Sequence, residues 1–303
     1  MLERLAAPLT TFVSVGAVVA VFVLLGFRDH VGADDGASFS VAWTAWRLCG
    51  ALAIAVFVVA LLVGARLLTE PSRWGLSTVT DRRQLYLLIA VGAVVLLTVL
   101  KAFGATFSPA SPVNELGIRT NAVLFAGLAA ATPWLVLVWL GLDAARALDV
   151  VRLAESPHDG LESLLQLRGL LIGSAGAFSV GVVAALLTSG ALRNAMLAYD
   201  PDRDDFPASS VLLYGAVFAI VLTILTLPFA SVWRSRAKGF VDEVFALPKD
   251  GKITEAWVTD RERLEHLLRI DVGLLRSPLT ALNVFAPLVT SLLAAFVPQL
   301  GTS

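Results

Sequence analysis

Long stretches without a charged residue dominate the pattern of hydrophobic and polar positions along the chain. A helix that crosses the hydrocarbon core of a bilayer needs about 20 apolar residues, and its backbone must form its hydrogen bonds internally. The uncharged runs therefore predict an all-α fold, a polytopic transmembrane bundle of about seven helices. The runs lie between Arg4 and Arg28, Arg47 and Arg66, Arg83 and Lys101, Arg119 and Asp143, Arg168 and Arg193, Asp205 and Arg234, and after Arg276.

The composition agrees with a membrane location. The 303 residues have a mean hydropathy of +0.80 and only 16% of them are charged, against roughly a quarter in soluble domains. A lone Cys49 leaves no disulfide within the chain, and a total of three His argues against a zinc site. A net charge of -1 gives no overall attraction to nucleic acid. We therefore expect no metal, no cofactor and no nucleic-acid partner.

The distribution of Lys and Arg predicts the orientation, because cytosolic connections carry an excess of these residues. With the N-terminus in the cytosol, 17 of the 23 Lys and Arg fall on the cytosolic side, and the opposite connections are acidic. Tryptophans at the ends of the predicted spans fit an interfacial aromatic belt: Trp43, Trp46, Trp139 and Trp233. We expect a multi-pass protein of the cytoplasmic (inner) membrane, with a cytosolic N-terminus and an extracytoplasmic C-terminus.

The connections divide the chain into three predicted parts. A six-span membrane domain with its cytosolic connections covers 1–233, a cytosolic amphipathic helical connection covers 234–276, and the seventh transmembrane helix lies in 277–303. The connection 143–168 is expected to continue the fourth span as a charged helix, to break at Ser156-Pro157 and to restart near Asp159.

Connection 234–276 carries the clearest signals of a folded cytosolic element. The run Thr259–Glu262 fits a capping box, which predicts that a helix begins there and extends from about 260 to 275. Leucine and valine recur along it at helical spacing, and Arg261 can pair with Glu265 one turn later. The sequence therefore predicts an amphipathic helix directly before the last span.

Small residues recur every four positions in the fifth predicted span. Such a stripe lets helix backbones approach closely, as in the GxxxG pattern. Three interpretations stay open: packing against another helix of the same subunit, contact with a second subunit, or lining of a pore. The stripe consists of Gly169, Gly173, Ala177, Gly181, Ala185 and Ser189.

Prolines inside three predicted spans mark candidate kinks, because each proline leaves a carbonyl without its helical donor. Channels and transporters use such breaks at gates, although prolines are also common in membrane helices generally. The candidate gating positions are Pro133, Pro228 and Pro287, with Asn283 near the last of them.

Two charged clusters flank the predicted spans. The basic cluster, at the cytosolic end of the sixth span, is expected to bind anionic lipid headgroups at about 1 kcal/mol for each residue. It consists of Arg234, Arg236 and Lys238. The acidic cluster is an outer cation funnel, a weak divalent site or a solvated loop. It consists of Asp200, Asp202, Asp204 and Asp205.

Absent features narrow the function. No Asp, Glu, His or Arg lies deep in a predicted span, which argues against ion-coupled transport. The G-x-S-x-G, H-E-x-x-H and P-loop motifs are missing, so we expect no catalytic residue and no enzyme.

Uncharged spans, a small-residue stripe and a folded cytosolic connection favour a homo-oligomeric ion channel or pore-type effector in the lipid bilayer. Its expected gating signal is a cytosolic ligand or partner protein that binds connections 143–168 and 234–276. Two alternatives remain: a facilitator or transporter of an uncharged or lipophilic solute, and a non-conducting membrane subunit that anchors a cytosolic partner.

Overall fold

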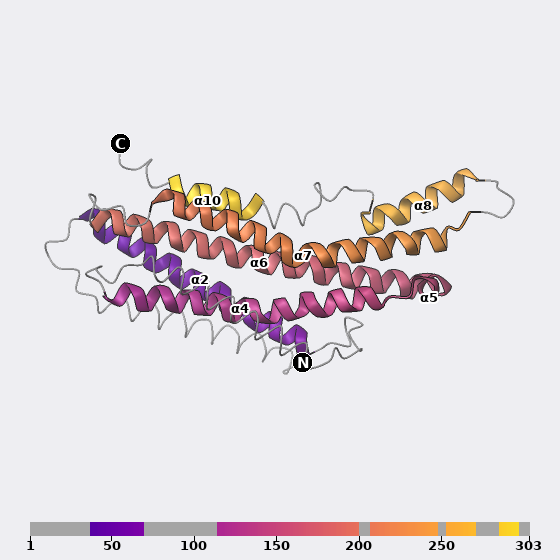
Figure 1. Cartoon of the computed structure of the whole chain (residues 1–303), viewed down its shortest axis with the longest axis horizontal. Helices are drawn as coiled ribbons and strands as arrows, with labels where there is room; N and C mark the ends of the chain where they lie inside the picture. The colour runs from indigo at the N-terminus through magenta and orange to yellow at the C-terminus, as the bar shows by residue number, and fades with distance from the viewer. Residues whose placement is uncertain (1–36, 70–113, 200–206, 248–252, 271–284, 297–303) are drawn as a thin grey trace, which may run out of the picture.

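The computed structural model describes residues 37–69, 114–199, 207–247, 253–270 and 285–296, which are helical apart from short connections. Its long helices are α2 (Ala37–Thr69), α4 (Asn114–Ala147), α6 (Pro157–Tyr199) and α7 (Ala208–Val244), and they extend along the long axis of the molecule (Figure 1). The shorter helices in the same part of the chain are α5 (Val150–Glu155), α8 (Glu255–Leu268) and α10 (Ala286–Phe296). The described chain is all-α, as predicted.

Among the residues that the structure describes, four helices are long and apolar enough to cross a membrane. They coincide with the second, fourth, fifth and sixth predicted spans, and their apolar character suggests a membrane location. The apolar segment of α10, Ala286–Ala295, is shorter than a span. The first and third predicted spans lie outside the described residues, so the count of seven stays a prediction. The four segments are Val41–Leu68, Ala126–Ala147, Pro157–Ala198 and Ala208–Val244.

Helices α6 and α7 are longer than a bilayer is thick. The 43 residues of α6 extend over about 65 Å at 1.5 Å per residue, whereas the hydrocarbon core of a bilayer is about 30 Å thick. In Figure 1 the surplus length lies at one end of the molecule, where α5 and α8 are found, and α10 lies near the opposite end. The apolar bundle therefore continues into a second helical region.

The apolar helices approach one another at small residues. α2 packs against α4 and α6, and α10 packs against α6 and α7. A Cβ atom added to Gly64 of α2 would lie 2.9 Å from Cγ of Pro133 in α4. One added to Gly190 of α6 would lie 2.6 Å from the carbonyl oxygen of Ala294 in α10. Without a side chain at these positions, the helix backbones come close enough for extensive van der Waals contact.

The largest hydrophobic cluster lies between α4, α6 and α7 and extends through both regions of the molecule. Phe229 and Phe240, two turns and more apart on α7, are both fully buried in it. Leu268 and Ile270, at the end of α8, belong to the same cluster. Helix α8 is therefore packed onto the bundle and does not extend into solvent alone.

The boundaries of α8 differ from the prediction. Its N-cap is Thr254, whose hydroxyl accepts a hydrogen bond from the Trp257 amide at 3.2 Å, and the helix ends at Leu268. The predicted start at Thr259 is wrong because this side chain lies inside the helix and donates to the Glu255 carbonyl at 3.0 Å. The predicted end near 275 is wrong because Arg269 leaves the helix in the left-handed region, with φ of 53°.

Two other boundaries also shift. α7 continues through Arg234 to Val244, so the expected start of the connection at 234 falls inside this helix. The predicted break at Ser156 is confirmed, and a further break follows Ala147. There Asp149 caps α5 by accepting hydrogen bonds from the Val151 and Arg152 amides, which satisfies donors at the helix start.

Candidate functional site

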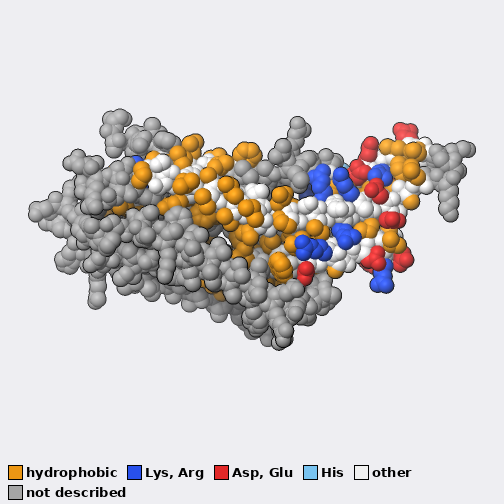
Figure 2. Space-filling view, viewed as in Figure 1, with side chains coloured by type: hydrophobic (Ala, Val, Ile, Leu, Met, Phe, Trp, Pro, Cys, Tyr) orange, Lys and Arg blue, Asp and Glu red, His pale blue; other side chains and the backbone are white. Residues whose placement is uncertain are grey.

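Charged side chains gather at one end of the molecule. Figure 2 shows Lys, Arg, Asp and Glu over the part that contains α5, α8 and the adjoining ends of α6 and α7, while hydrophobic side chains predominate among the described residues visible in the other part. We call the region formed by residues 148–168, 234–247 and 253–270 the charged end. Two of its helices, α6 and α7, continue into the apolar bundle, so the geometry of the charged end is coupled to that of the bundle.

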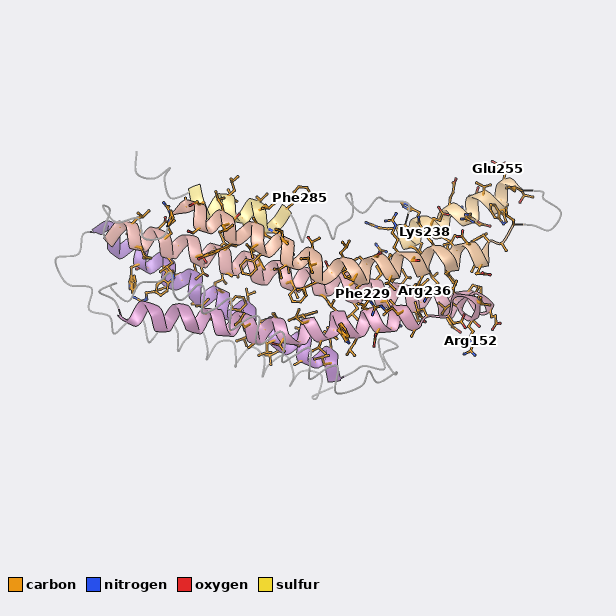
Figure 3. The ribbon with its side chains drawn as sticks, in the orientation of Figure 1. Arg152, Phe229, Arg236, Lys238, Glu255 and Phe285 are labelled. Carbon is orange, nitrogen blue, oxygen red and sulfur yellow. The ribbon has the colours of Figure 1, made fainter. Side chains whose placement is uncertain are left out.

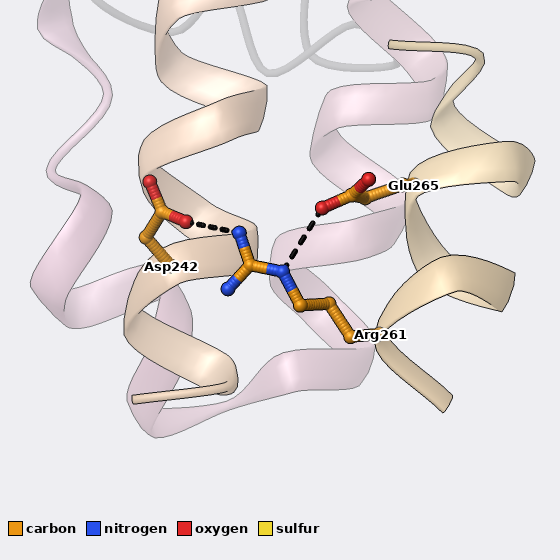
Figure 4. Close-up of polar contacts among 3 residues, drawn as sticks. All are labelled: Asp242, Arg261 and Glu265. Atoms are coloured by element: carbon orange, nitrogen blue, oxygen red, sulfur yellow. Dashed lines mark hydrogen bonds and ion pairs between the residues drawn. The ribbon is translucent and has the colours of Figure 1, made fainter. Parts of the chain in front are cut away.

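Arg261 joins the middle of α8 to the end of α7. Its Nη2 donates to Oδ1 of Asp242 at 2.6 Å, and its Nε donates to Oε1 of Glu265 at 3.0 Å (Figure 4). The predicted pairing of Arg261 with Glu265 is thereby confirmed. The hydrogen bond that Arg261 donates to the Asp242 carboxylate is the largest cause that raises the pKa of Arg261 above its ordinary value. The guanidinium therefore stays charged, and it connects two helices.

Aromatic contacts reinforce this connection. The rings of Phe245 and Trp257 meet edge to face with centroids 6.1 Å apart. The guanidinium of Arg261 lies 5.6 Å from the centroid of the Trp257 ring, within the range of a cation–π interaction. The N-terminal half of α8 is thus attached to the last turns of α7 by one ionic and one aromatic contact.

Arginines hold the other end of α8. Nη1 of Arg168, on α6, donates to the carbonyl of Leu267 at 3.3 Å, and Nη2 of Arg234, on α7, donates to the carbonyl of Ile270 at 2.5 Å. The positive charge of Arg269 lies close enough to Arg168 for the two to repel. We call Arg168, Arg234 and Arg269 the arginine junction. It brings three elements together at the level where the apolar runs of α6 and α7 end.

The turn at Arg269 explains why sequence reasoning placed the end of α8 too late. The amide of Arg269 donates to the His266 carbonyl at 3.0 Å and that of Ile270 to the Glu265 carbonyl at 3.1 Å. These two bonds form a Schellman motif, whose left-handed residue is usually glycine. Arg269 is the one non-glycine residue with positive φ in the described chain. With arginine in place of glycine, the sequence carried no stop signal.

The basic cluster assigned to lipid headgroups has contacts within the protein. Nη2 of Arg236 donates to the Arg146 carbonyl at 2.9 Å, at the C-terminal end of α4, and Arg234 belongs to the arginine junction. Lys238 is exposed. Figure 3 shows Arg236 and Lys238 between Phe229, in the apolar part, and Glu255, at the far end of α8. Lipid binding by this cluster stays a prediction, and two of its arginines also cap helix ends.

The small-residue stripe of α6 divides into two parts. A Cβ added to Gly181 would lie 3.7 Å from the Phe57 ring of α2. Ala185 packs against the hydrophobic cluster that contains Phe57. At Gly169 and Gly173, an added Cβ would meet no atom within 4 Å among the residues described. Ala177 packs against the large cluster, and the hydroxyl of Ser189 donates to its own helix at the Ala185 carbonyl.

The candidate kink residues lie in three different settings. Pro133 is buried inside α4 against Gly64, and Pro228 is exposed inside α7. Pro287 is the second residue of α10, so it lies in the first turn of the helix as described, and Asn283 lies outside the described residues. Hydroxyls near the first two prolines bond within their own helix: Thr132 to the Leu128 carbonyl and Thr226 to the Leu222 carbonyl.

At the opposite end of the bundle, Arg193 differs from the expectation that the fifth span ends before it. It lies within α6 and is 4% exposed. Its chain neighbour Leu192 packs against Trp43 and Trp46, whose rings are 5.0 Å apart. The helical spacing of the apolar residues around it was the available signal. The acidic cluster Asp200, Asp202, Asp204 and Asp205 lies outside the described residues.

The contacts at the charged end are hydrogen bonds, ion pairs and aromatic contacts. Within the residues described, no group of three or more His, Cys, Asp or Glu is placed to hold a metal ion. Comparison with models of known protein families, with curated proteins and with solved structures finds no match to this chain.

Proposed function

We propose that this protein is an oligomeric pore in the cytoplasmic membrane whose conduction is controlled through α8. The observation that carries the proposal is the attachment of α8 to both long helices: Arg261 joins it to α7 through Asp242, and Arg168 joins it to α6 through the Leu267 carbonyl. A ligand or protein partner that binds the charged end would displace α8, and through these contacts it would shift α6 and α7 as well. The proposal assigns the protein no enzymatic activity.

The chain provides a second route from α8 into the apolar bundle. After Ile270 it continues through residues 271–284 to α10, which packs against α6 and α7. At that contact an added Cβ on Gly215 would overlap Ser291 of α10, and one on Gly190 would lie 2.6 Å from the Ala294 carbonyl oxygen. Such close contacts resist compression. A displacement of α10 would therefore move α6 and α7 as well.

The proposed pore forms between copies of the chain. The exposed glycines Gly169 and Gly173, which meet no described neighbour within 4 Å, offer a surface where a second helix backbone can approach. Apolar pores of this kind conduct when a constriction becomes wet and close when it dries. In this arrangement the chain has seven spans, the charged end lies in the cytosol and the C-terminus lies on the opposite side.

Planar-bilayer recording of the purified full-length protein tests the proposal, with its oligomeric mass measured in the same detergent. Arg261→Gln removes the hydrogen bonds to Asp242 and Glu265, and we expect it to change the open probability of the pore. Arg263→Gln is the matched control, because Arg263 lies on the same helix and pairs only with the neighbouring Asp260 among the contacts described. A monodisperse oligomer without current, or equal gating in both variants, contradicts the proposal.

A second candidate function is a membrane anchor for a cytosolic protein. It is favoured by the acidic side chains that surround α5 and α8 at the far end of the molecule (Figure 2). Several of them are exposed: Asp149, Glu155, Asp159, Glu243, Glu255 and Glu262. Under this reading the protein co-purifies with a soluble partner and carries no current. Neutralising Glu155 and Glu243 to Gln then releases the partner, whereas it leaves the gating of a pore unchanged.

A further inference from the structure

The side of α8 that faces away from α7 combines acidic and apolar side chains. Glu255, Val258 and Glu262 follow one another at i, i+3 and i+7, so they lie on one side of the helix. All three residues are exposed. Trp257 and Arg261 lie on the other side and contact α7. We call Glu255, Val258 and Glu262 the outer face of α8.

The start of α8 adds a second exposed apolar residue. Thr254 is the N-cap, so Ile253 directly precedes the cap and Val258 is the fourth residue of the helix. Side chains at these two positions commonly pack against each other. Ile253 is 56% exposed and Val258 is 38% exposed. Figure 2 shows hydrophobic side chains among acidic ones at this end of the molecule. In water, covering such a pair with apolar surface is favourable.

The two carboxylates of the outer face have no cation from the described part of the chain. Neither Glu255 nor Glu262 forms an ion pair there. The two arginines inside the helix, Arg261 and Arg263, pair with other acidic side chains. Seven residues along a helix correspond to about 10 Å, which is too far for the two carboxylates to share one metal ion. They fit two separate cationic side chains of a partner.

The outer face lies away from the level of the membrane. The arginine junction lies where the apolar runs of α6 and α7 end, and the 14 residues of α8 extend about 21 Å from it. Figure 3 shows Glu255 at the far end of this helix. Anionic lipids of the cytosolic leaflet would repel the carboxylates of the outer face. A second copy of the chain presents the same carboxylates and would repel them as well. A basic partner from the aqueous phase therefore fits this face.

We propose that the outer face of α8 docks a helix of a cytosolic protein whose basic side chains lie two turns apart and flank apolar ones. The basic side chains pair with Glu255 and Glu262, and the apolar ones cover Ile253 and Val258. The C-terminal end of α8 stays in place, because Leu268 is buried in the large hydrophobic cluster. The partner therefore acts on the N-terminal half of α8, which has no buried residue. This inference names the partner of the proposed pore and rests on that function for its consequence.

Binding of a defined peptide to the full chain tests the docking face. The probe is a short synthetic helical peptide with lysines at positions i and i+7 and leucines at i+3 and i+4. The protein is held in nanodiscs of phosphatidylcholine, which has no net charge, and empty nanodiscs measure the affinity of the peptide for the bilayer. A second peptide carries glutamates in place of the lysines. We expect only the lysine peptide to bind the protein in excess of the empty nanodiscs. Binding of both peptides, of neither, or to the bilayer alone overturns the inference.

Paired substitutions locate the peptide on the protein. Glu255→Gln combined with Glu262→Gln should weaken binding about tenfold, at about threefold for each exposed ion pair. The control combines Asp260→Asn with Glu162→Gln, which removes the same number of exposed carboxylates away from the outer face. It should leave the affinity nearly unchanged. An equal loss of affinity in both double variants shows general attraction by charge and overturns the inference.

A second pair of variants tests the apolar part of the docking face. Val258→Ser should weaken binding about fivefold, because the apolar surface that the peptide covers is lost. Val151→Ser makes the same change at an exposed position of α5 and should have no effect. If Val258→Ser also has no effect, the attraction is purely ionic and the docking of an apolar helix surface is refuted.

Current recorded from the same preparation distinguishes failure of this inference from failure of the proposed function. Binding of the lysine peptide with the expected pattern among the variants, but without current under any condition, refutes the pore and leaves the docking face standing. Current from the protein, together with no binding of the lysine peptide, refutes the docking face and leaves the pore standing.

Discussion

The apolar half of the bundle and the charged end are held together by different interactions. In the apolar half, helices meet at glycine and alanine, as at Gly190 with Ala294, and the hydroxyl of Thr223 bonds to its own helix. The side-chain hydrogen bonds between helices there are made by uncharged donors, as from Trp134 Nε1 to the Ala60 carbonyl at 2.9 Å. At the charged end, helices are joined by arginine side chains, as Arg261 of α8 is to Asp242 of α7 at 2.6 Å.

The difference follows from the solvent that each region is suited to. In a lipid environment, burying apolar surface between helices gains little, so close van der Waals contact must provide the attraction. In water, burial of large side chains and charge-assisted hydrogen bonds provide it. The same two helices, α6 and α7, use small residues in one half and large or charged residues in the other. Substitutions that exchange small residues for large ones, or large residues for small ones, should therefore have opposite effects in the two halves.

The largest expected effect comes from emptying the core of the charged end. Phe240 is fully buried, and an added Cβ on Gly160 would lie 2.7 Å from its ring, so the site is tightly packed. Phe240→Ala should cost about 3–5 kcal/mol in local stability because it leaves a cavity. Hydrogen exchange should show faster opening of α5 and α8 with little change in α2. If amide protection fell equally in all helices, the two regions would not be stabilised separately.

A smaller effect is expected from filling a close contact in the apolar half. Gly215→Leu places a side chain where Ser291 of α10 lies, and overpacking of this kind costs about 1–3 kcal/mol. Thermal unfolding in detergent should show the loss. Gly173→Leu is the control, since an added Cβ there meets no described atom within 4 Å. It should leave the melting temperature unchanged and, if the stripe joins copies, lower the oligomeric mass. Equal destabilisation by both variants would contradict this distinction.

The ion pair of Arg261 and Asp242 should contribute less, because its side chains are 29% and 63% exposed. Asp242→Asn should cost about 0.5 kcal/mol, the usual value for an exposed pair. Since the pKa of Arg261 is raised, its contribution is present at every pH below its unfolded value and is lost only when the pH rises through the folded value. Protection of α8 amides should therefore fall with added salt and not between pH 6 and 8.

A further effect, of the opposite sign, is expected at the turn formed by Arg269. A non-glycine residue in the left-handed region costs roughly 1–2 kcal/mol, partly offset by the unfolded-state entropy that glycine adds. Arg269→Gly should therefore stabilise the C-terminal end of α8 by up to about 1 kcal/mol, visible as slower exchange of the Ile270 amide. Arg263→Gly, in the interior of the same helix, should destabilise it by about 1 kcal/mol. If both variants stabilised α8, or both destabilised it, the left-handed turn could not be the cause of the change in stability.

Some features of the candidate site followed from local sequence and others did not. The pairing of Arg261 with Glu265 was predictable because residues four apart share one face of a helix. The hydrogen bond from Arg168 to Leu267 joins positions 99 residues apart, and nothing in the spacing of either segment indicates it. The start of α8 was misplaced because Thr254 and Thr259 both carry the side chain of a helix cap, and only the path of the chain selects one.

The sequence by itself determined the class of this protein: apolar runs of membrane length, helices throughout the described residues, and a break at Ser156. These are consequences of hydrophobicity and backbone chemistry that act over a few residues. The tertiary structure alone decided that α8 lies against α6 and α7, that Arg193 is buried, and that Gly215 and Ser291 meet. Such contacts join segments distant in the chain, so their energies depend on how whole helices pack and not on any local pattern.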